Sequence, residues 1–540
     1  MPLVEEWKSW RTVPGRLRYW ANRDPGLPFL QCSSSPDETS WLTYGDVEDR
    51  SDALAGALTE IGVNHGDRVA IMLSNRLEYL MTFFALARLG AIQVPLNPYL
   101  KGDFLAYQLA DSAAKVLVGD TSAMNQIAPL RADLPDLAQT VTVDDVADAP
   151  AGTLAFDDLV RGGRRGPAAR IEPTDLIAVM YTSGTTGRPK GCMLSQGYYF
   201  AMAWPWYQND WLRSGDRTLT AMPLHHIGGQ GIALMPVLLA GNSIAFLDRF
   251  SASGFIEAAR DITASVAFGV GPMGSAMLAT PESSADRDHQ LRLGVFVPMA
   301  VANQDRMAER FGIDVVSETY GQTECNPITG SPIDRDPSKR ASLGRPVPAM
   351  EVQLHDECGR EVAEGDVGEI VMRPREAEVM FQGSWNKAEA TVEASRGMWH
   401  HTGDLARADA DGYLYFADRK KDSMRRRGEN ISSVELENAI SGHSKISAVA
   451  VHAVPSPLGE DDVKAVIVMV EGESFTPEEL HGFFKEKIPY FAVPRYVEFL
   501  DGLPLTPTGR VQKHLLRERD NSGAWDFEAL GLTIERSQRR

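Results

Sequence analysis

The sequence predicts an α/β fold: a large N-terminal domain of stacked α/β subdomains plus a barrel-like subdomain, followed by a small, mobile C-terminal α+β domain. Its 540 residues are too many for one hydrophobic core, so more than one domain is expected. Apolar strand patterns alternate with helical patterns in the first half, and this alternation changes after a charged run near residue 420. We therefore place the large domain at residues 1–418, a hinge at 419–421 and the small domain at 422–540.

The first half supplies the strands and helices of the large domain. The segment 78–90 predicts a helix closed by Gly90, and apolar runs predict strands at 68–73, 91–96, 114–119, 175–183 and 218–224. Strands that alternate with helices imply parallel sheets covered by helices. The glycine-rich stretch 362–411 has short strand patterns and predicts an antiparallel or barrel-like subdomain.

The small C-terminal domain shows a different order of elements. Residues 433–440 and 477–488 predict helices, and residues 446–454 and 464–471 predict strands. The tail after Arg517 is polar, and we expect it to be loosely ordered.

Composition excludes several classes of function. The formal net charge of -19 disfavours nucleic acid or an anionic membrane as a main partner. No apolar run reaches the roughly 18 residues that span a membrane, and the N-terminus lacks a signal-peptide core. The four cysteines, at positions 32, 192, 325 and 358, form no C-x-x-C pair, so neither a disulfide framework nor a structural zinc site is expected. We predict a soluble cytoplasmic protein.

The strongest local signal is the segment YTSGTTGRPKG at residues 181–191, which follows a predicted strand. Its glycines let backbone amides approach an anion, its hydroxyls donate to phosphate oxygens, and Lys190 adds a positive charge. The alternative is a surface turn rich in glycine and threonine. A Walker loop is excluded because the spacing of its glycines and lysine is absent.

This segment resembles the phosphate-binding loop of the superfamily of acyl-CoA synthetases, peptide-synthetase adenylation domains and beetle luciferases. Further segments are similar to motifs of that superfamily, in the same order: LGAIQVPLNP (89–98), PLHHIGG (223–229), YGQTE (320–324), GEI (368–370), HTGDLA (401–406) and the run 418–437. The resemblance covers roughly residues 15–517. It implies two half-reactions, in which a carboxylic acid and ATP give acyl-AMP and the acyl-AMP and CoA then give a thioester.

The resemblance also implies roles for residues of the nucleotide site. Phosphates would be held by Thr182, Ser183, Gly184, Thr185, Thr186 and Lys190. Tyr320 would stack on adenine, with Gly321 and Thr323 of the same motif beside it, and Glu324 would hold Mg²⁺, which prefers oxygen ligands. Asp404 would accept both ribose hydroxyls, and Arg419 would also contact ribose. In isolation, Asp404 would be read as a turn-capping residue.

At the acyl end, the resemblance implies that His226 is a gate or pocket residue, although a structural histidine is the alternative. The acyl pocket would be shaped by His225, Gly229, Gly231, Gly269, Gly271 and Pro272. Val295 and Phe296 stand where the superfamily has small residues and would narrow that pocket or repack it for another acyl group. The segment IGGQGIA lacks the aspartate of amino-acid-activating members, which favours a substrate without an α-amino group.

The second half-reaction involves the region around the predicted hinge. Lys421 matches the hinge residue of the superfamily, and Gly428 matches a glycine beside the pantetheine tunnel. The basic residues 425–427 are either a solvated turn or contacts for the phosphates of CoA.

One departure lies in LPLTPTGRVQK, where Arg510 replaces the lysine that bridges carboxylate and α-phosphate during adenylation. Lys513 is the only nearby substitute. We therefore expect weak or absent adenylation, with thioester formation from acyl-AMP retained and a separate adenylating enzyme as a possible partner. The alternatives are a complete two-step acyl-CoA synthetase, a carrier-protein or amide ligase of the same fold, and a catalytically silent ligand-binding protein.

Overall fold

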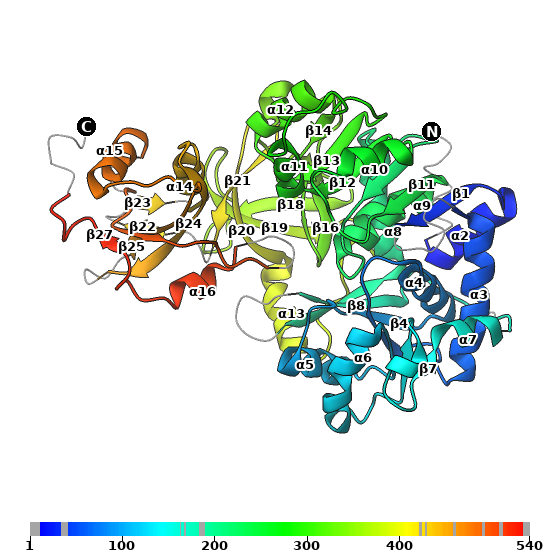
Figure 1. Ribbon diagram of the computed structural model, residues 1–540. Helices are drawn as coiled ribbons and strands as arrows, with labels where there is room; N and C mark the ends of the chain where they lie inside the picture. The colour runs from blue at the N-terminus through cyan, green and yellow to red at the C-terminus, as the bar shows by residue number, and fades with distance from the viewer. Residues whose placement is uncertain are drawn as a thin grey trace. The chain divides into compact units, whose positions relative to one another are not determined.

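A computed structural model describes most of the chain (Figure 1). The described residues are 11–33, 41–162, 164–166, 169–182, 189–420, 424–426, 429–431, 433–456, 461–488, 492–506 and 511–532. They form two compact units: the first contains residues up to Val352 together with Met372–His400, and the second contains Gln353–Val371 and the residues from His401 onward. The predicted α/β class is confirmed, whereas the hinge at 419–421 stays a prediction.

The first sheet of the large unit has seven strands in the order β7-β6-β5-β3-β4-β8-β9. All neighbours are parallel except β8 and β9, which form an antiparallel pair. The strands are β3 (Arg68–Met72), β4 (Ile92–Pro95), β5 (Val116–Gly119), β6 (Gln139–Thr142), β7 (Leu154–Ala155), β8 (Leu176–Thr182) and β9 (Lys190–Ser195). The predicted strands at 68–73, 91–96, 114–119 and 175–183 therefore lie in one sheet.

The helices associated with this sheet include the one that sequence predicted at 78–90. They are α3 (Tyr44–Glu60), α4 (Leu77–Leu89), α5 (Gly102–Ser112), α6 (Thr121–Ile127), α7 (Phe156–Gly162) and α8 (Gln196–Gln208). Every residue of α4 from Tyr79 to Leu89 is buried, which agrees with its apolar sequence. Gly90 caps the helix at a φ of 68°, in the left-handed region that favours glycine.

The second sheet also has seven strands, in the order β14-β13-β12-β10-β11-β1-β2, and only β2 is antiparallel to its neighbour. The strands are β1 (Pro28–Cys32), β2 (Leu42–Thr43), β10 (Arg217–Thr220), β11 (Ser243–Phe246), β12 (Val266–Val270), β13 (Leu293–Val297) and β14 (Asp314–Val316). Its helices are α2 (Val13–Arg23), the π-helical turn η4 (Gly228–Leu234), α9 (Met235–Ala240), α10 (Phe255–Asp261), α11 (Gly271–Leu278) and α12 (Val301–Phe311).

The strand predicted at 218–224 is shorter in the structure, because β10 ends at Thr220. Pro223 has no amide hydrogen to donate to a sheet, and the backbone of Leu224 is bound by a side chain instead, since its amide donates to Asn75 Oδ1 over 2.8 Å. The residues that follow β10 thus form a loop that leads into η4.

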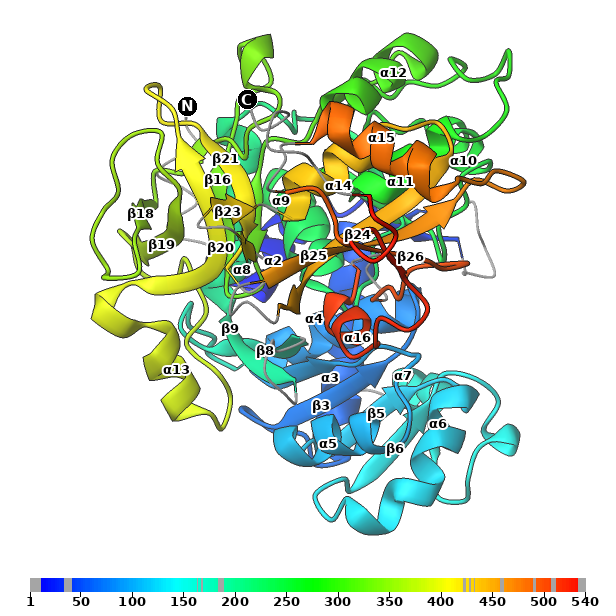
Figure 2. The same cartoon turned by 90° about the vertical axis from the view of Figure 1, so that its left-hand side faces the viewer.

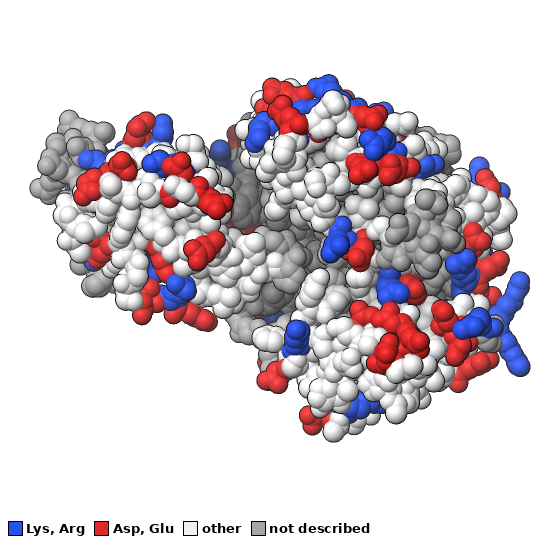
Figure 3. All heavy atoms as spheres, in the orientation of Figure 1, with Lys and Arg blue, Asp and Glu red and all other residues white. Residues whose placement is uncertain are grey.

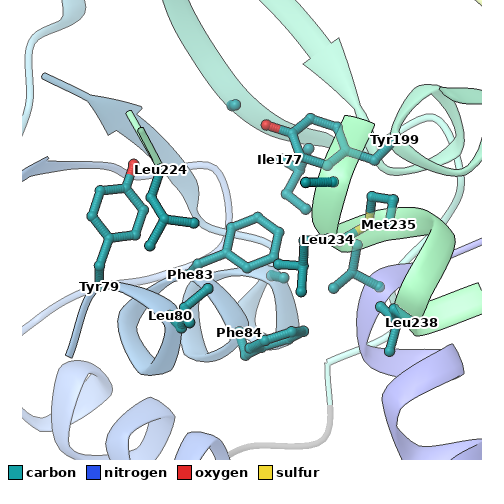
Figure 4. Packing of buried hydrophobic residues seen from close by; sticks show 14 of the residues in the cluster. Tyr79, Leu80, Phe83, Phe84, Ile177, Tyr199, Leu224, Leu234, Met235 and Leu238 are labelled. Carbon is teal, nitrogen blue, oxygen red and sulfur yellow. The ribbon is translucent and has the colours of Figure 1, made fainter. Parts of the chain in front are cut away.

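One hydrophobic core is shared by the two seven-stranded sheets. It contains residues of β3 and β8 from the first sheet and of β1, β11 and β12 from the second. Figure 4 shows side chains of α4, α8, η4 and α9 meeting in this core, with Phe83 and Phe84 near its centre. The stacked α/β subdomains that sequence predicted are therefore present.

Shorter strands follow the second sheet. A three-stranded sheet contains β15 (Tyr320–Gln322), β16 (Cys325–Gly330) and β17 (Arg345–Pro346). A four-stranded sheet has β18 (Met350–His355), β19 (Gly368–Pro374), β20 (His400–Ala408) and β21 (Leu414–Arg419) in that order, and β20 and β21 are antiparallel. This agrees with the antiparallel alternative for residues 362–411. The helix α13 (Ala388–Ala394) precedes β20.

The C-terminal part of the second unit has the predicted α+β composition. Its strands are β22 (Met424–Arg426), β23 (Glu429–Ile431), β24 (Ile446–Pro455), β25 (Asp461–Met469), β26 (Tyr496–Phe499) and β27 (Trp525–Asp526), and its helices are α14 (Ser433–Ser441), α15 (Pro477–Lys487) and α16 (Lys513–Arg517). Figure 2 shows α14 and α15 on one face of the β24-β25-β26-β27 sheet and α16 on the other, and two separate hydrophobic clusters fill these faces.

The prediction of a loosely ordered tail after Arg517 is wrong for the residues up to Leu532. Trp525 pairs with Val497 at the edge of the sheet, and Phe527 is 1% exposed. The Arg495 guanidinium also holds Asp526 at 3.0 Å. Trp525 and Phe527 lie within a mostly polar segment, so its average composition concealed them.

The surface carries both signs of charge. In the view of Figure 3, acidic and basic side chains are interspersed on the face toward the reader. Among the described residues, each helix is too short or too polar to cross a lipid bilayer.

Candidate active site

The predicted phosphate loop joins two strands of the first sheet. Thr182 at the end of β8 lies directly opposite Lys190 at the start of β9, so the two ends of the loop are adjacent. Residues 183–188, with the predicted phosphate contacts Ser183, Gly184, Thr185 and Thr186, lie outside the described ranges.

Side chains from α5 hold both ends of this loop. The Tyr181 hydroxyl donates to Asp111 Oδ2 over 2.7 Å, and the Tyr107 hydroxyl donates to the carbonyl oxygen of Pro189 over 3.2 Å. Burial raises the pKa of Tyr181, and Asp111 raises it further, so its hydroxyl stays a hydrogen-bond donor. These contacts fix the two strands from which the loop extends.

A buried cysteine connects the loop to the predicted metal residue. The Cys192 sulfur lies 3.9 Å from Thr182 Oγ1 and is fully buried. Burial raises the pKa of Cys192 well above its usual value, and Glu324 raises it further through its negative charge and a hydrogen bond from the thiol. The charge of Lys190 acts in the opposite direction. Thr182, which sequence assigned to phosphates, thus lies beside this thiol, and the charges of Lys190 and Glu324 both act on it.

The backbone around Glu324 is held from two sides. The Tyr198 hydroxyl donates to the carbonyl oxygen of Thr323 over 3.1 Å, and the Phe381 amide donates to the carbonyl oxygen of Glu324 over 2.8 Å. Glu324 lies in the turn between β15 and β16, so these hydrogen bonds fix the backbone from which its side chain extends.

Tyr320, the predicted adenine contact, lies on β15 in the same hairpin. Its ring is half-buried against a small core that includes Ile328 and Val347, and the Gln322 amide donates to its hydroxyl over 3.3 Å. Gly321 follows, where a Cβ atom would lie only 2.7 Å from the Asn326 side chain. A larger residue at position 321 would push against Asn326 on the neighbouring strand.

The two predicted ribose contacts are cross-strand neighbours in the second unit. Asp404 on β20 lies directly opposite Arg419 on β21, and a register shift follows at Leu405/Ala406. Asp404 is 5% exposed, and its amide donates to Thr402 Oγ1 over 3.2 Å. The Thr402 hydroxyl in turn donates to the carbonyl oxygen of Ile370 over 2.7 Å. The backbone that carries Asp404 is thus bonded to the neighbouring strand β19.

The predicted gate histidine lies in the loop between β10 and η4. His226 Nδ1 accepts a hydrogen bond from the Gly228 amide over 3.0 Å, so its Nε2 carries the proton in the neutral ring. Burial, and to a smaller extent the neighbouring His226, lowers the pKa of His225 to about 3. His225 is therefore neutral near pH 7.

A fully buried network of polar side chains lies beside this loop. Gln230 Oε1 accepts from the Tyr199 hydroxyl over 2.8 Å and also from the Gln93 amide, and Gln230 Nε2 donates to the Tyr79 hydroxyl over 2.9 Å. The same Nε2 donates to the carbonyl oxygen of Leu224, the residue before His225. Gln230, Gln93, Tyr79 and Tyr199 are each 0% exposed. Because Asn75 binds the Leu224 amide, the backbone of Leu224 is held at both of its polar groups.

Two of the predicted acyl-pocket glycines lie in close contact with their neighbours, and at Gly229 the neighbour is backbone. A Cβ atom on Gly229 would collide with the Pro223 carbonyl oxygen, and one on Gly231 would collide with the end of the Met202 side chain. Both therefore let the loop and η4 fold closely against their surroundings.

The remaining residues of the predicted pocket lie on β12, β13 and α11. A Cβ atom on Gly269 would lie 2.9 Å from the Phe296 ring, and one on Gly271 would collide with the Pro298 carbonyl oxygen. Phe296 and Val295 are 0% and 1% exposed and belong to two different hydrophobic clusters, because successive residues of β13 face opposite sides of the sheet. Their effect on an acyl group stays a prediction.

Lys421, Gly428 and Arg510 lie outside the described residues. Lys513, the possible substitute for Arg510, is described. Its Nζ lies 2.8 Å from Glu437 Oε1 and donates to Ser433 Oγ over 2.7 Å, and its side chain is 12% exposed. Lys513 is thus engaged within its own unit.

Within the described parts of the chain, no three His, Cys, Asp or Glu side chains gather as a metal site. A single carboxylate, Glu324, close to the ends of the predicted phosphate loop fits Mg²⁺ held jointly by protein and phosphate oxygens, which is how this ion is commonly bound.

Comparison with known proteins gives consistent results. The sequence pattern of a family described as AMP-binding enzyme matches residues 17–385, and that of the AMP-binding enzyme C-terminal domain matches residues 435–510. The chain is 32% identical over 488 residues to a crotonobetaine/carnitine–CoA ligase of Salmonella paratyphi B, covering 88% of this chain and 93% of the relative.

Two solved structures are similar along almost the whole chain. The anthranilate CoA ligase AuaEII in complex with anthranoyl-AMP has a TM-score of 0.84 and 27% identity, covering 94% of this chain and 96% of that chain. ATP-bound MatB from Rhodopseudomonas palustris has the same TM-score and identity, covering 94% of this chain and 98% of that chain.

Proposed function

The chain belongs to the AMP-binding enzyme family, and we propose that it is an acyl-CoA ligase that forms a thioester from an acyl-adenylate and CoA. The superfamily membership indicated by the ordered motifs is thereby confirmed. The observation that carries the nucleotide part of the proposal is the pairing of Thr182 with Lys190 at the two ends of the predicted phosphate loop, with the Cys192 thiol beside Thr182 and subject to the charge of Glu324. The named relatives, which are CoA ligases, support the thiol acceptor.

Each half-reaction has a clear electron balance. In the first, a carboxylate oxygen attacks the α-phosphorus of ATP, the acyl–phosphate bond forms, and pyrophosphate leaves. In the second, the CoA sulfur attacks the acyl carbon, the carbon–sulfur bond forms, AMP leaves, and the thiol proton is released. Bound Mg²⁺ would neutralise part of the phosphate charge, and Glu324 would hold it. Asp404 and Arg419 would hold the ribose during both steps.

Adenylation is the weaker step in this proposal. The position that bridges carboxylate and α-phosphate holds Arg510, whose guanidinium is wider and planar where an ammonium is compact. Misplacement by about 1 Å can cost around a hundredfold in rate. The amine of Lys513, the possible substitute, is bonded to Glu437 and Ser433, which supports the proposal that adenylation is weak. A separate enzyme that supplies acyl-AMP is required only if this protein does not adenylate the acid itself.

The acid is proposed to lack an α-amino group. The loop that would hold a carboxylate for the substrate ammonium contributes Gln230 instead. Both ends of the Gln230 amide are bonded to protein groups in a fully buried network, so Gln230 offers no negative charge. An unpaired ammonium buried there would be costly.

Two further parts of the proposal come from the sequence. The first is that the small domain rotates about residues 419–421 between the half-reactions and brings Gly428 beside the pantetheine arm. The second is that the protein acts in the cytoplasm. A rigid hinge, Lys421→Pro, should therefore slow the overall reaction while each ligand still binds.

The proposal is tested by offering synthetic acyl-adenylates to three acceptors: CoA, an acyl carrier protein and simple amines. We expect acyl-CoA and AMP to form with CoA and little product with the other two. Preferential acylation of a carrier protein or an amine would establish the alternative ligase function. The absence of product with every acceptor, while AMP still binds, would favour a ligand-binding protein.

A further inference from the structure

The Glu369 carboxylate lies at the centre of the four-stranded sheet and receives three hydrogen-bond donors. His401 Nδ1 lies 3.0 Å from its Oε2, Lys420 Nζ lies 3.0 Å from the same oxygen, and the Gly403 amide donates to Oε1 over 3.1 Å. The side chain of Glu369 is 4% exposed. His401 and Gly403 are on β20, Lys420 follows β21 directly, and Glu369 itself is on β19.

These contacts bind the turn that precedes Asp404. A carboxylate only accepts hydrogen bonds, so His401 Nδ1 carries a proton. Gly403 has a φ of 73° and is held at both polar groups, because its carbonyl oxygen accepts from the Lys420 amide over 2.9 Å. The residue between His401 and Gly403, Thr402, is bonded to the carbonyl oxygen of Ile370, the neighbour of Glu369. Little freedom remains in the backbone that presents Asp404.

The charge of Glu369 is maintained by the same contacts. Burial alone would raise the pKa of Glu369, but hydrogen bonds from His401 and Lys420 outweigh burial and hold the pKa below its usual value. A buried carboxylate with charged or polar donors on both oxygens makes hydrogen bonds that are stronger than those between neutral groups. Replacing it by an amide would weaken all three contacts at once.

Lys420 extends this arrangement to the other predicted ribose residue. It follows Arg419, which lies opposite Asp404 across β20 and β21. One carboxylate thus connects the strand that carries Asp404 to the strand that carries Arg419. Neither Glu369 nor Lys420 needs to touch the nucleotide for this effect.

We propose that Glu369 is a positioning residue for the ribose site: it binds the HTGD turn together with Lys420, so that Asp404 presents its carboxylate to the ribose. The inference rests on the proposed nucleotide role of Asp404. It concerns the binding of AMP alone and does not depend on the acyl group or on CoA.

The test compares the affinity of three proteins for AMP and for 2′,3′-dideoxy-AMP by isothermal titration calorimetry. The proteins are the parent, Glu369→Gln and the control Glu351→Gln. Glu351 also pairs with a guanidinium, Arg373 at 2.9 Å, but both residues of that pair are more exposed. Lys420→Met serves as a milder second variant, because the side chain of Lys420 is 40% exposed.

The parent should bind AMP at least about tenfold more tightly than the dideoxy analogue, since each hydrogen bond to a charged group contributes on the order of tenfold. Glu369→Gln should bind AMP about tenfold more weakly than the parent and should discriminate less between the two ligands. Lys420→Met should shift both values in the same direction by a smaller factor, and Glu351→Gln should leave both unchanged.

The outcomes separate a positioning role from a structural one. A folded Glu369→Gln or Lys420→Met variant that discriminates between AMP and the dideoxy analogue as well as the parent would overturn the inference, even if its melting temperature were lower. The same comparison tests the ribose role of Asp404. If the Asp404→Ala variant preferred AMP over the dideoxy analogue as strongly as the parent does, Asp404 would not bind ribose, and the inference would fall with it.

Discussion

Replacing Gln230 with leucine should disturb the loop that carries His225 and His226 and destabilise the large unit. Leucine has nearly the shape of glutamine but no polar atoms. The change removes the donor to the carbonyl oxygen of Leu224 and to the Tyr79 hydroxyl, and it removes the partner of the Gln93 amide. The Tyr199 hydroxyl retains a contact of 3.4 Å with Gln93.

The magnitude follows from these lost partners. Each buried polar group left without a hydrogen bond costs about 1–3 kcal/mol. Three such groups would give roughly 3–9 kcal/mol, but Gln93 and Tyr199 can pair with each other, and leucine buries apolar surface in place of the amide. We therefore expect a loss of about 3–5 kcal/mol in the free energy of unfolding of the large unit.

The assay combines stability with kinetics. Urea unfolding followed by hydrogen exchange in α4 and α8 reports the loss, and Gln382→Leu is the control, because its amide makes an exposed hydrogen bond to the carbonyl oxygen of Thr174. Since Gln230 holds the residue before His225, the KM for the acyl substrate should rise about tenfold while the KM for the nucleotide stays unchanged. A loss below about 1 kcal/mol with an unchanged acyl KM would refute this reasoning.

Two other predictions concern the small unit. Burial lowers the pKa of His452 to about 4 from an ordinary value of 6.5. The unfolded chain therefore binds more protons over this pH range, so the free energy of unfolding should fall by about 3 kcal/mol as the pH drops from 6.5 to 4. His452→Gln should make the stability less dependent on pH, as measured by hydrogen exchange in β24. Lys513→Met should destabilise the unit by about 1–3 kcal/mol, because Glu437 and Ser433 lose their partner. The control is Lys487→Met, since Lys487 forms an exposed ion pair with the adjacent Glu486. This control should change the free energy of unfolding by less than about 0.5 kcal/mol. If Lys513→Met abolished pyrophosphate release while the protein stayed folded, Lys513 would be the substitute for the missing lysine.

Much of the fold and of the site could be predicted because their signals are local. Strands β3, β4, β5 and β8 are short apolar runs, and α4 ends at a glycine that the sequence shows directly. The site motifs are also contiguous, so their order alone indicated the superfamily. Strand pairing brings Thr182 opposite Lys190 and Asp404 opposite Arg419, while the roles of these residues stay predictions.

The residues that hold the site could not be predicted, because their partners are distant in the sequence. Gln230 meets Gln93 across 137 positions, and Asp111 meets Tyr181 across 70. Cys192 was considered only as a candidate for disulfide or zinc chemistry, and its position beside Glu324 depends on the pairing of β9 with β8. Glu369 appeared within a matching motif, but nothing local indicated its three donors.

Val295 and Phe296 remain predicted pocket residues. The sequence shows only that two small residues of the superfamily are replaced, and the structure adds that the Phe296 ring is buried against Gly269 and Gly294. Whether the neighbouring backbone still borders the acyl group is decided by packing between strands, which a single sequence does not display.

The central claim is that thioester formation is retained while Arg510 impairs adenylation. It is tested most directly by measuring both half-reactions with the same acids: pyrophosphate release from acid and ATP, and acyl-CoA formation from the corresponding acyl-AMP and CoA. The account predicts that the second rate exceeds the first by at least about a hundredfold, and that Arg510→Lys raises only the first. Acid-dependent pyrophosphate release by the unmodified protein at a rate equal to its thiol transfer would contradict it.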